Sequence, residues 1–277
     1  MDIYEQQSVT PTFWMLGERL CSWQILTMGL VLGRERAALI DTGMGVLGDL
    51  KAKVGTLTGL PLVTLLTHGD PDHIGGAELF DPVYMNPLDA ELVPWALDPK
   101  SKWENLELMV EGNAALLAEA KEKMLRGTAL AFQPLSEGDV FDLGGVQLEA
   151  VALPGHSKGS LCFVNWRDGY AFVGDAVCRN TFLWLKRCPP LSVHLAALER
   201  FRSRVGDGMT LYFGHSLAPL PKTMLVDSIR CCREVLAGET ARDPFYNPEV
   251  GKDQKPDRLM QHTVGTASIV YDADRVC

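Results

Sequence analysis

The stretch from Thr67 to Gly76 constrains this chain most, because it places two histidines and two aspartates within six residues. It follows the apolar run 62–66, whose flanking Pro and Gly predict a buried strand. The polar side chains therefore stand where a strand ends and its loop begins. They are His68, Asp70, Asp72 and His73. Imidazoles and carboxylates converging there suit zinc, iron or manganese. The alternative is an ordinary polar loop with solvated aspartates.

The same arrangement, an apolar strand followed by a residue that can bind a metal, recurs three times. The pairs are residues 151–155 before His156, residues 170–174 before Asp175, and residues 211–214 before His215. Four of the six histidines in the chain occupy such positions. A single histidine after a strand is usually a surface or capping residue. Four strand ends with one pattern favour a shared metal centre over a polar loop.

These residues resemble the signature of the metallo-β-lactamase superfamily of dinuclear metal hydrolases. The family motif is His-x-His-x-Asp-His, followed by a histidine, an aspartate and a final histidine. This chain has His68-x-Asp70-x-Asp72-His73 and then His156, Asp175 and His215. Segments 40–43 and 154–160 also resemble family motifs, and the resemblance covers roughly residues 9–216. One position departs from the pattern, since Asp70 stands where the family has its second histidine.

The resemblance implies an α/β (α+β) fold, a four-layer αββα sandwich with all the ligands at one edge. It implies two divalent metal ions per chain, zinc first, with iron or manganese as alternatives. Carried over by position, the first metal is bound by His68, Asp70 and His156. The second is bound by Asp72, His73 and His215, with Asp175 bridging. Asp41, at the end of a predicted strand, would support the centre without binding a metal, since an outer carboxylate can orient a ligand.

The activity that the resemblance implies is metal-dependent hydrolysis. A hydroxide bridging two metals would attack an ester, lactone, thioester or similar small-molecule bond, and Asp72 would pass a proton to the leaving group. Two alternatives stay open. One is a redox-active di-iron protein, because the related flavodiiron reductases also replace the second histidine by a carboxylate. The other is a catalytically silent binding protein of the same fold.

The carboxylate of Asp70 changes the expected charge of the centre. Three aspartates and a bridging hydroxide cancel the four positive charges of two divalent metals, whereas a histidine at this position leaves one positive charge. A carboxylate is also a harder ligand than imidazole, which favours iron or manganese. We therefore expect the bound water to be less acidic than in relatives with the usual motif.

Composition limits the partners. We interpret the 277 residues, 47% of them hydrophobic, as one globular domain spanning 1–277. A net charge of −9 argues against nucleic acid and anionic membranes, leaving a small-molecule substrate. The start of the chain does not resemble a signal peptide and no run has the length of a membrane span. Seven irregularly spaced cysteines indicate a reducing cytoplasm rather than a disulfide framework. The oligomeric state stays open, a dimer included.

The remaining pattern predicts the order of the elements. Strands are expected at 9–15, 24–32 and 37–41, a helix at 46–57, hairpins within 138–153 and 161–174, and an edge strand at 267–271. A helical insert at about 86–133 is either a packed layer or a lid lined by Trp95, Trp103 or Met109. A C-terminal helix and tail occupy 222–277. Ser192 is expected to cap a helix whose first turn holds His194. His262 is considered only as a substrate contact, and the substrate-binding residues are otherwise unknown.

Overall fold

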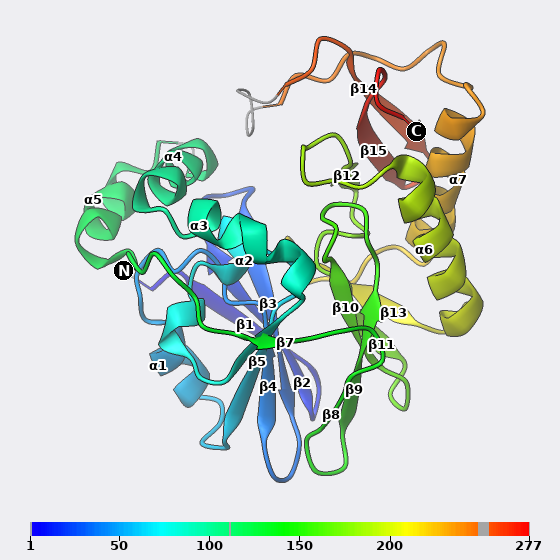
Figure 1. The fold of residues 1–277 in the computed structure, drawn as a ribbon. Coiled ribbons are helices and arrows are strands. Elements are labelled where there is room, and N and C mark those ends of the chain that lie inside the picture. The colour runs from blue at the N-terminus through cyan, green and yellow to red at the C-terminus, as the bar shows by residue number, and fades with distance from the viewer. Residues whose placement is uncertain (1, 111, 249–254, 277) are drawn as a thin grey trace.

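Two β-sheets packed face to face, with helices outside each, form the four layers of this molecule (Figure 1). The computed structural model describes residues 2–110, 112–248 and 255–276. The predicted α/β class and the αββα arrangement are confirmed. A third, smaller sheet lies beside the C-terminal helices (Figure 1).

The first sheet has seven strands in chain order, antiparallel from β1 to β4 and parallel from β4 to β7. Their bounds are β1 Tyr4–Thr10, β2 Phe13–Arg19, β3 Ile25–Leu32, β4 Ala37–Ile40, β5 Leu62–Leu65, β6 Val83–Met85 and β7 Gln133–Pro134. The strand expected at 9–15 is wrong, because a hairpin turn falls within it and the polar segment before it is itself a strand. That segment, β1, is tolerated because it lies at the sheet edge, where its polar side chains reach solvent.

The second sheet runs β13-β11-β10-β9-β8, and the third runs β12-β15-β14. The bounds are β8 Val140–Asp142, β9 Gln147–Ala152, β10 Leu161–Asn165, β11 Tyr170–Phe172, β12 Asn180–Phe182, β13 Thr210–Tyr212, β14 Leu259–Val264 and β15 Ala267–Asp272. Both predicted hairpins are present. The strand near 267–271 is not at an edge, because β15 pairs with β12 on one side and β14 on the other.

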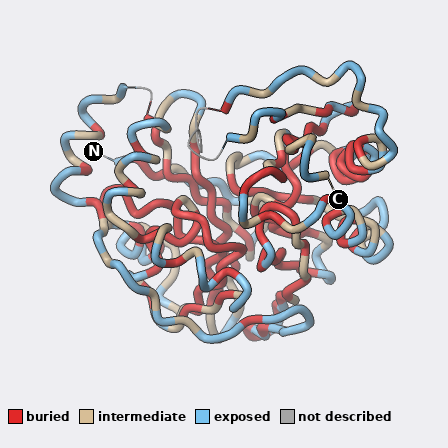
Figure 2. The backbone as a smooth tube through the Cα atoms, turned by 45° about the horizontal axis from the view of Figure 1, so that its top comes forward, coloured by how far each residue is buried: buried red, intermediate tan, exposed pale blue. Residues whose placement is uncertain are grey.

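Because side chains alternate along each strand, the two faces of the first sheet pack into two different hydrophobic cores. Ala38 and Ile40 of β4 face the second sheet, whereas Ala37 and Leu39 face the helical layer, as a period of two requires. Between the sheets, the ring of Phe13 stacks on Tyr170 with centroids 4.3 Å apart. Figure 2 shows that the buried backbone is concentrated in these central layers.

The helices cover the outer faces of the sheets. They are α1 Leu50–Gly55, α2 Pro71–Ile74, η1 Ala77–Leu79, η2 Pro87–Leu92, α3 Val93–Ala96, α4 Pro99–Met109, α5 Ala114–Lys123, α6 Leu191–Val205 and α7 Met224–Leu236. The helix expected from residue 46 begins only at Leu50, because Gly45 and Gly48 have φ of 70° and 69°, which a right-handed helix excludes. Ser192 is not a cap, since α6 begins one residue earlier after Pro190. Among the described residues, no helix combines the length and apolarity needed to cross a membrane.

The helical insert is a packed layer. Leu106, Leu116 and Ala120 are fully buried in the core beneath the first sheet. The buried ammonium of Lys102 donates to the carbonyl oxygens of Gly75 at 3.0 Å and Leu125 at 2.9 Å. Gly75 directly follows α2, so Lys102 fastens the insert to the element that carries Asp72 and His73.

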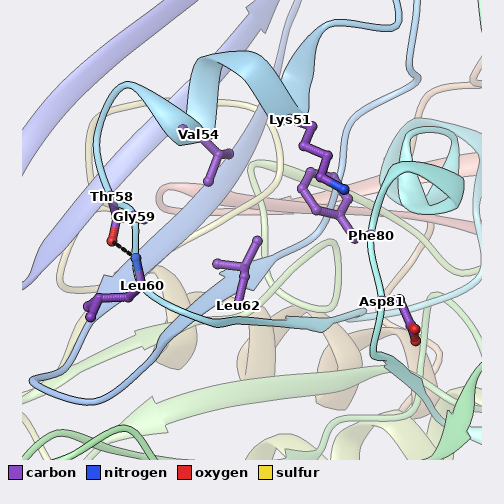
Figure 3. Close-up of a pocket in the computed structure, with 9 residues that line it drawn as sticks. Lys51, Val54, Thr58, Gly59, Leu60, Leu62, Phe80 and Asp81 are labelled. Atoms are coloured by element: carbon purple, nitrogen blue, oxygen red, sulfur yellow. Dashed lines mark hydrogen bonds between the residues drawn. The ribbon is translucent and has the colours of Figure 1, made fainter.

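A cavity of about 350 Å³ opens between α1 and the start of β5 (Figure 3). Its lining includes the apolar side chains of Val54, Leu60, Leu62 and Phe80 and the charged side chains of Lys51 and Asp81. None of the seven predicted metal-binding residues lines this cavity. It is therefore separate from the candidate site.

Candidate metal centre

The candidate site lies where strands of the two sheets end together. β4 and β5 are parallel in the first sheet, and β11 and β13 are parallel in the second. Parallel strands present their carboxyl ends at one edge. The loops after these strands carry Asp41, the stretch 67–73, Asp175 and His215, while His156 follows β9. Asp72 and His73 lie in the short helix α2 rather than in an open loop.

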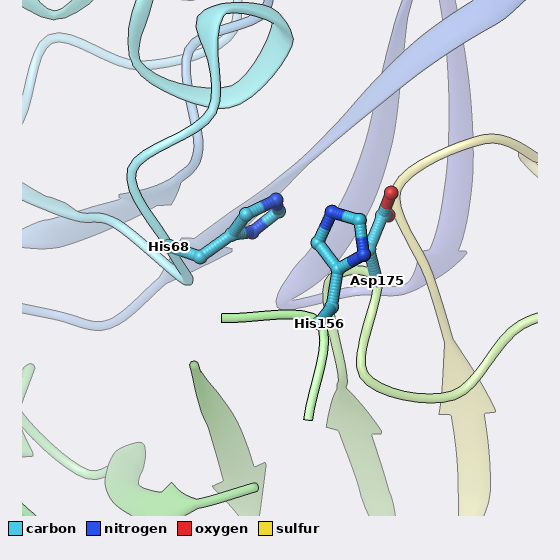
Figure 4. Close-up of side chains that lie close together, drawn as sticks. All are labelled: His68, His156 and Asp175. Carbon is cyan, nitrogen blue, oxygen red and sulfur yellow. The ribbon is translucent and has the colours of Figure 1, made fainter. Parts of the chain in front are cut away.

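Six of the seven predicted residues form two groups whose potential ligand atoms lie within 4.8 Å of one another. One group is His68, His156 and Asp175, and the other is Asp72, His73 and His215. Figure 4 shows the side chains of the first group converging from different loops. Asp70 adjoins this group, with Oδ2 at 3.0 Å from Nε2 of His156 and 3.8 Å from Nε2 of His68. The structure thus brings all seven residues together.

The inner atoms of these residues fit a bound cation. Buried atoms with no hydrogen-bond partner among the described residues include Nε2 of His68, Nε2 of His73, Oδ1 of Asp70 and Oδ1 of Asp175. Leaving a buried polar atom unpaired costs about 1–3 kcal/mol. Four such atoms at one place are explained if bound cations take them as ligands. Nitrogen and carboxylate donors are the set that zinc and iron accept.

Asp41 orients two of the histidines at once. Its Oδ2 lies 2.8 Å from Nδ1 of His73 and accepts from the hydroxyl of Thr67 at 2.7 Å. Its Oδ1 accepts from the amide of Thr67 at 2.7 Å, and Nδ1 of His68 lies 3.0 Å from the same hydroxyl. Because both Nδ1 atoms face acceptors, both Nε2 atoms are left to face the centre. Asp41 has φ of 61°, a conformation that few residues adopt.

The other two histidines are also held by their outer nitrogens. Nδ1 of His156 donates to the carbonyl oxygen of Phe182 at 3.0 Å. Nδ1 of His215 lies 3.5 Å from Nε2 of the Gln24 side chain. The carbonyl of Phe182 leaves Nε2 of His156 facing the centre, the kind of outer contact that orients metal-binding histidines in general. Nε2 of His215 faces Oδ2 of Asp175 at 3.0 Å.

Asp89, from the helical insert, joins the two loops that carry the first group. Its carboxylate accepts from the amide of Gly69 at 3.0 Å, the hydroxyl of Ser157 at 2.6 Å and the amide of Gly159 at 2.8 Å. Gly69 follows His68, and Ser157 follows His156. The spacing between these histidines thus depends on one buried carboxylate. Burial raises the pKa of Asp89, although the three donors oppose this.

Arg187 reaches Asp70 from the loop after β12. Nη2 of Arg187 forms an ion pair with Oδ2 of Asp70 and lies 3.3 Å from Nε2 of His156. Its guanidinium also lies over the ring of Trp95, 5.5 Å from the centroid, a favourable cation–π arrangement. Trp95 belongs to α3, so this contact brings the helical insert to the first group.

The charges of the metal-free site are strongly coupled. Burial lowers the pKa of His68 well below its usual value. Burial opposes ionisation of Asp70, but Arg187 and His156 hold the pKa of its carboxyl far below the usual range. Burial likewise opposes protonation of His73, but Asp72, Asp175 and Asp41 raise its pKa. Protonated histidine beside the carboxylates therefore provides, without metal, part of the positive charge that a cation would supply.

Three residues considered from sequence lie outside the centre. His262 is buried between Asp243, at 2.8 Å from Nδ1, and Glu234, at 3.1 Å from Nε2. His194 is buried and donates from Nδ1 to the carbonyl of Pro154 at 2.9 Å. Trp103 packs within the insert, where the ammonium of Lys121 lies 5.8 Å from its ring centroid.

Sequence reasoning missed two residues of the site. Asp89 ends the run Asn86-Pro87-Leu88-Asp89, a pattern that indicates only a helix start or a turn. Arg187 follows Lys186 in a segment with no periodicity that distinguishes it. The one available signal concerned Arg187 alone: a carboxylate at position 70 of a buried motif needs a cation nearby.

The fold and these two groups define a metallohydrolase-like centre. The family model of the metallo-beta-lactamase superfamily matches residues 25–215, so the chain belongs to that superfamily. The resemblance found in the sequence is thereby confirmed.

Individual relatives agree with this assignment. The human protein named acyl-coenzyme A thioesterase MBLAC2 is 29% identical over 213 residues, covering 71% of this chain and 72% of the human protein. A lactamase-like protein, nscB of Aspergillus fumigatus, is 29% identical over 164 residues, covering 58% of this chain and 39% of that protein. Among solved structures, a metallo-beta-lactamase from Pontibacter korlensis gives a TM-score of 0.60 at 19% identity, covering 83% of this chain and 99% of that one. The last similarity concerns the fold alone. Family and relatives together support a hydrolase.

Proposed function

We propose that this protein is a dinuclear metal-dependent hydrolase that cleaves thioester bonds of small acyl substrates. The observation that carries the proposal is the pair of three-residue groups whose inner atoms lack partners among the described residues. Membership of the superfamily supports hydrolysis, and the thioesterase named among the relatives supports a thioester within the wider set of esters and lactones.

We assign the first metal to His68, His156 and Asp175, with Asp70 as an added ligand. The second we assign to Asp72, His73 and His215. Asp175 is suited to bridge the two, because it groups with His68 and His156, while its Oδ2 lies 3.0 Å from Nε2 of His215, which is assigned to the second metal. Zinc is the proposed metal, with iron or manganese as alternatives.

Two bound divalent cations would activate a water molecule and polarise the substrate carbonyl. The protein holds three of the histidines in one orientation, His68 and His73 through Asp41 and Thr67 and His156 through the carbonyl of Phe182. Asp72 lies 3.7 Å from Nε2 of both His73 and His215, where it can pass a proton toward a leaving group. A thiol with a pKa of about 8.5 leaves readily as thiolate, so a thioester makes small demands on that transfer.

Two features support a small acyl substrate: the position of Trp95 in the helical insert and the net charge of the protein. Trp95 of the insert is half-buried, and its ring lies beside the guanidinium of Arg187. We propose that it forms part of the wall against which a small acyl group lies. A net charge of −9 favours a small-molecule substrate over nucleic acid or an anionic membrane. A cytoplasmic location belongs to the same proposal.

Hydrolysis of a substrate panel tests the proposal. The metal-stripped protein is reloaded with zinc, and an acyl-coenzyme A thioester, an oxygen ester and a lactone are compared by kcat/KM. We expect the thioester to be the best substrate, with activity lost on stripping and restored on reloading. His156→Ala and His215→Ala should each remove most of the activity, whereas His262→Gln, a buried histidine outside the centre, should retain it.

Other outcomes are equally informative. Metal-dependent hydrolysis of the lactone or ester but not the thioester would support the hydrolase activity and contradict the thioester as the substrate class. Zinc loading without hydrolysis of any panel member would contradict the proposal. Iron bound in the purified protein, with reversible oxidation and reduction, would favour the redox-active di-iron alternative.

A further inference from the structure

Asp70 and Arg187 form a buried pair of opposite charges next to the first group of ligands. The side chain of Asp70 is 8% exposed and that of Arg187 is 12% exposed. Oδ2 of Asp70 is engaged by Nη2 of Arg187, whereas Oδ1 is buried with no partner among the described residues. The two carboxylate oxygens therefore have different surroundings: Oδ2 faces the guanidinium of Arg187, whereas Oδ1 is available to a metal.

The arginine is itself held in place. Its guanidinium lies over Trp95 at 5.5 Å, and Nε is buried without a hydrogen-bond partner in the described part of the chain. Removing one partner of a buried ion pair leaves the other charge uncompensated, so Arg187 and Asp70 depend on each other. Asp70 is the carboxylate that Arg187 contacts. Nη2 also lies 3.3 Å from Nε2 of His156, a contact that a metal on that nitrogen would replace while leaving the contact to Asp70.

We propose that Arg187 is a positioning residue and counter-charge for Asp70. It holds Oδ2 so that Oδ1 faces the first metal, much as Asp41 holds Nδ1 of His73. The pair has no net charge, as a neutral histidine would have none. The net charge of the centre counted from metals, ligands and hydroxide alone omits Arg187. Its positive charge offsets the negative charge of Asp70. This inference rests on the metal centre of the proposed function but not on its substrate.

The proposal changes what a substitution at position 70 should do. From the sequence alone, Asp70→His would restore the usual ligand set of the superfamily. With Arg187 present, that substitution leaves a buried guanidinium without its carboxylate and beside a divalent cation. Like charges close together in a partly buried site repel more strongly than they would in water. Asp70→His should therefore restore the usual set only when Arg187 is also replaced.

The test measures the effect of Asp70→His on first-site metal affinity in two backgrounds. Full-length protein is stripped, and Zn²⁺ binding is followed by competition with a coloured chelator. Co²⁺ absorption reports ligand geometry independently of activity. We expect Asp70→His to weaken the first site at least tenfold when Arg187 is present. In the Arg187→Met background, we expect the same change to weaken it less than threefold.

Arg204→Met is the matched control background. Arg204 also pairs with a carboxylate, that of Glu149 at 2.7 Å, and also lies over a tryptophan, Trp166, at 4.7 Å. Neither Glu149 nor Trp166 belongs to the candidate centre. Asp70→His should weaken the first site as strongly in this background as in the wild type. Arg187→Lys, which keeps the charge, should behave like the wild type as well.

An equal effect of Asp70→His with and without Arg187 overturns the proposal. If the histidine variant does not fold, as judged by circular dichroism, the same comparison is made with Asp70→Asn, which keeps the shape of the side chain and removes its charge. A wild-type protein that takes up no metal would contradict the proposed function and this inference together. Metal uptake without coupling would contradict this inference alone.

Discussion

Nδ1 of His73 lies 2.8 Å from Oδ2 of Asp41, and the same carboxylate reaches His68 through the hydroxyl of Thr67. His68 and His73 belong to different groups of the candidate centre. One carboxylate that binds no metal in our assignment therefore orients a ligand of each metal.

Asp41→Asn tests this arrangement. Asparagine tolerates the left-handed backbone that Asp41 adopts at φ 61°, so the change removes a charged acceptor without adding backbone strain. Loss of such an outer contact typically lowers metal affinity 10–100-fold. We expect both metals to be weakened, as measured by chelator competition. Unchanged affinity at both sites would show that the histidines hold their orientation without Asp41.

Asp89→Asn should weaken the first site and the fold together. An amide has one acceptor oxygen, and its NH₂ group would face at least one of the donors from Gly69, Ser157 and Gly159. A buried donor left unpaired costs about 1–3 kcal/mol. We expect the free energy of unfolding of the metal-free protein to fall by about 2 kcal/mol and first-site affinity to fall more than second-site affinity. Asp142→Asn, at an exposed carboxylate, is the control. Equal loss at both metal sites would contradict a role specific to the first.

Trp95→Ala should alter substrate preference without removing metal. Trp95 lies against Arg187, whereas Trp103 packs within the insert and serves as the matched control. We expect the ratio of kcat/KM for a short and a long acyl thioester to change by about tenfold in Trp95→Ala, equivalent to about 1.4 kcal/mol. The ratio should stay near the wild-type value in Trp103→Ala. Metal analysis provides the second measurement, and an unchanged ratio in both variants would assign Trp95 to packing alone.

His194 should make the metal-free protein sensitive to acid. Burial lowers the pKa of His194 to about 4, below the unfolded value of about 6.5. The unfolded chain therefore binds a proton between these values while the folded chain does not. Stability is full above about pH 6.5 and is lost as pH falls toward 4, by about 1.4 kcal/mol per pH unit.

His194→Gln keeps a donor for the carbonyl of Pro154 but does not titrate. The difference in unfolding free energy between wild type and variant, measured by urea denaturation at pH 7 and pH 4.5, isolates this histidine from other acid-sensitive groups. We expect the wild type to lose stability relative to the variant at the lower pH. A difference that is the same at both pH values would contradict a buried neutral His194.

The sequence predicted the position of each candidate ligand because every one follows an apolar strand. Strand periodicity locates the ends of strands, and parallel pairing brings those ends to one edge. Asp41 was also predicted, since it follows β4 in the same way. Two boundaries were predicted wrongly because hydrophobic periodicity did not determine them. The helix predicted to be capped by Ser192 begins one residue earlier, after Pro190. The strand predicted at 9–15 is interrupted by a two-residue hairpin turn.

Asp89 and Arg187 could not be predicted by the same reasoning. Each acts through contacts with residues far away in the chain, from Asp89 to Ser157 and from Arg187 to Asp70. Such pairs form when separate loops pack together, and the local sequence pattern does not predict which loops will meet. The need for a cation near Asp70 was physically foreseeable, but its location was not.

The metal-to-protein ratio tests the central claim most directly. Stripped protein is reloaded, freed of excess metal and analysed by inductively coupled plasma mass spectrometry, alongside His156→Ala and His215→Ala. We expect two metal ions per chain in the wild type and one in each variant, with the remaining ion at the site that was left intact. One ion or none in the wild type, or two in both variants, would contradict a centre built from these two groups.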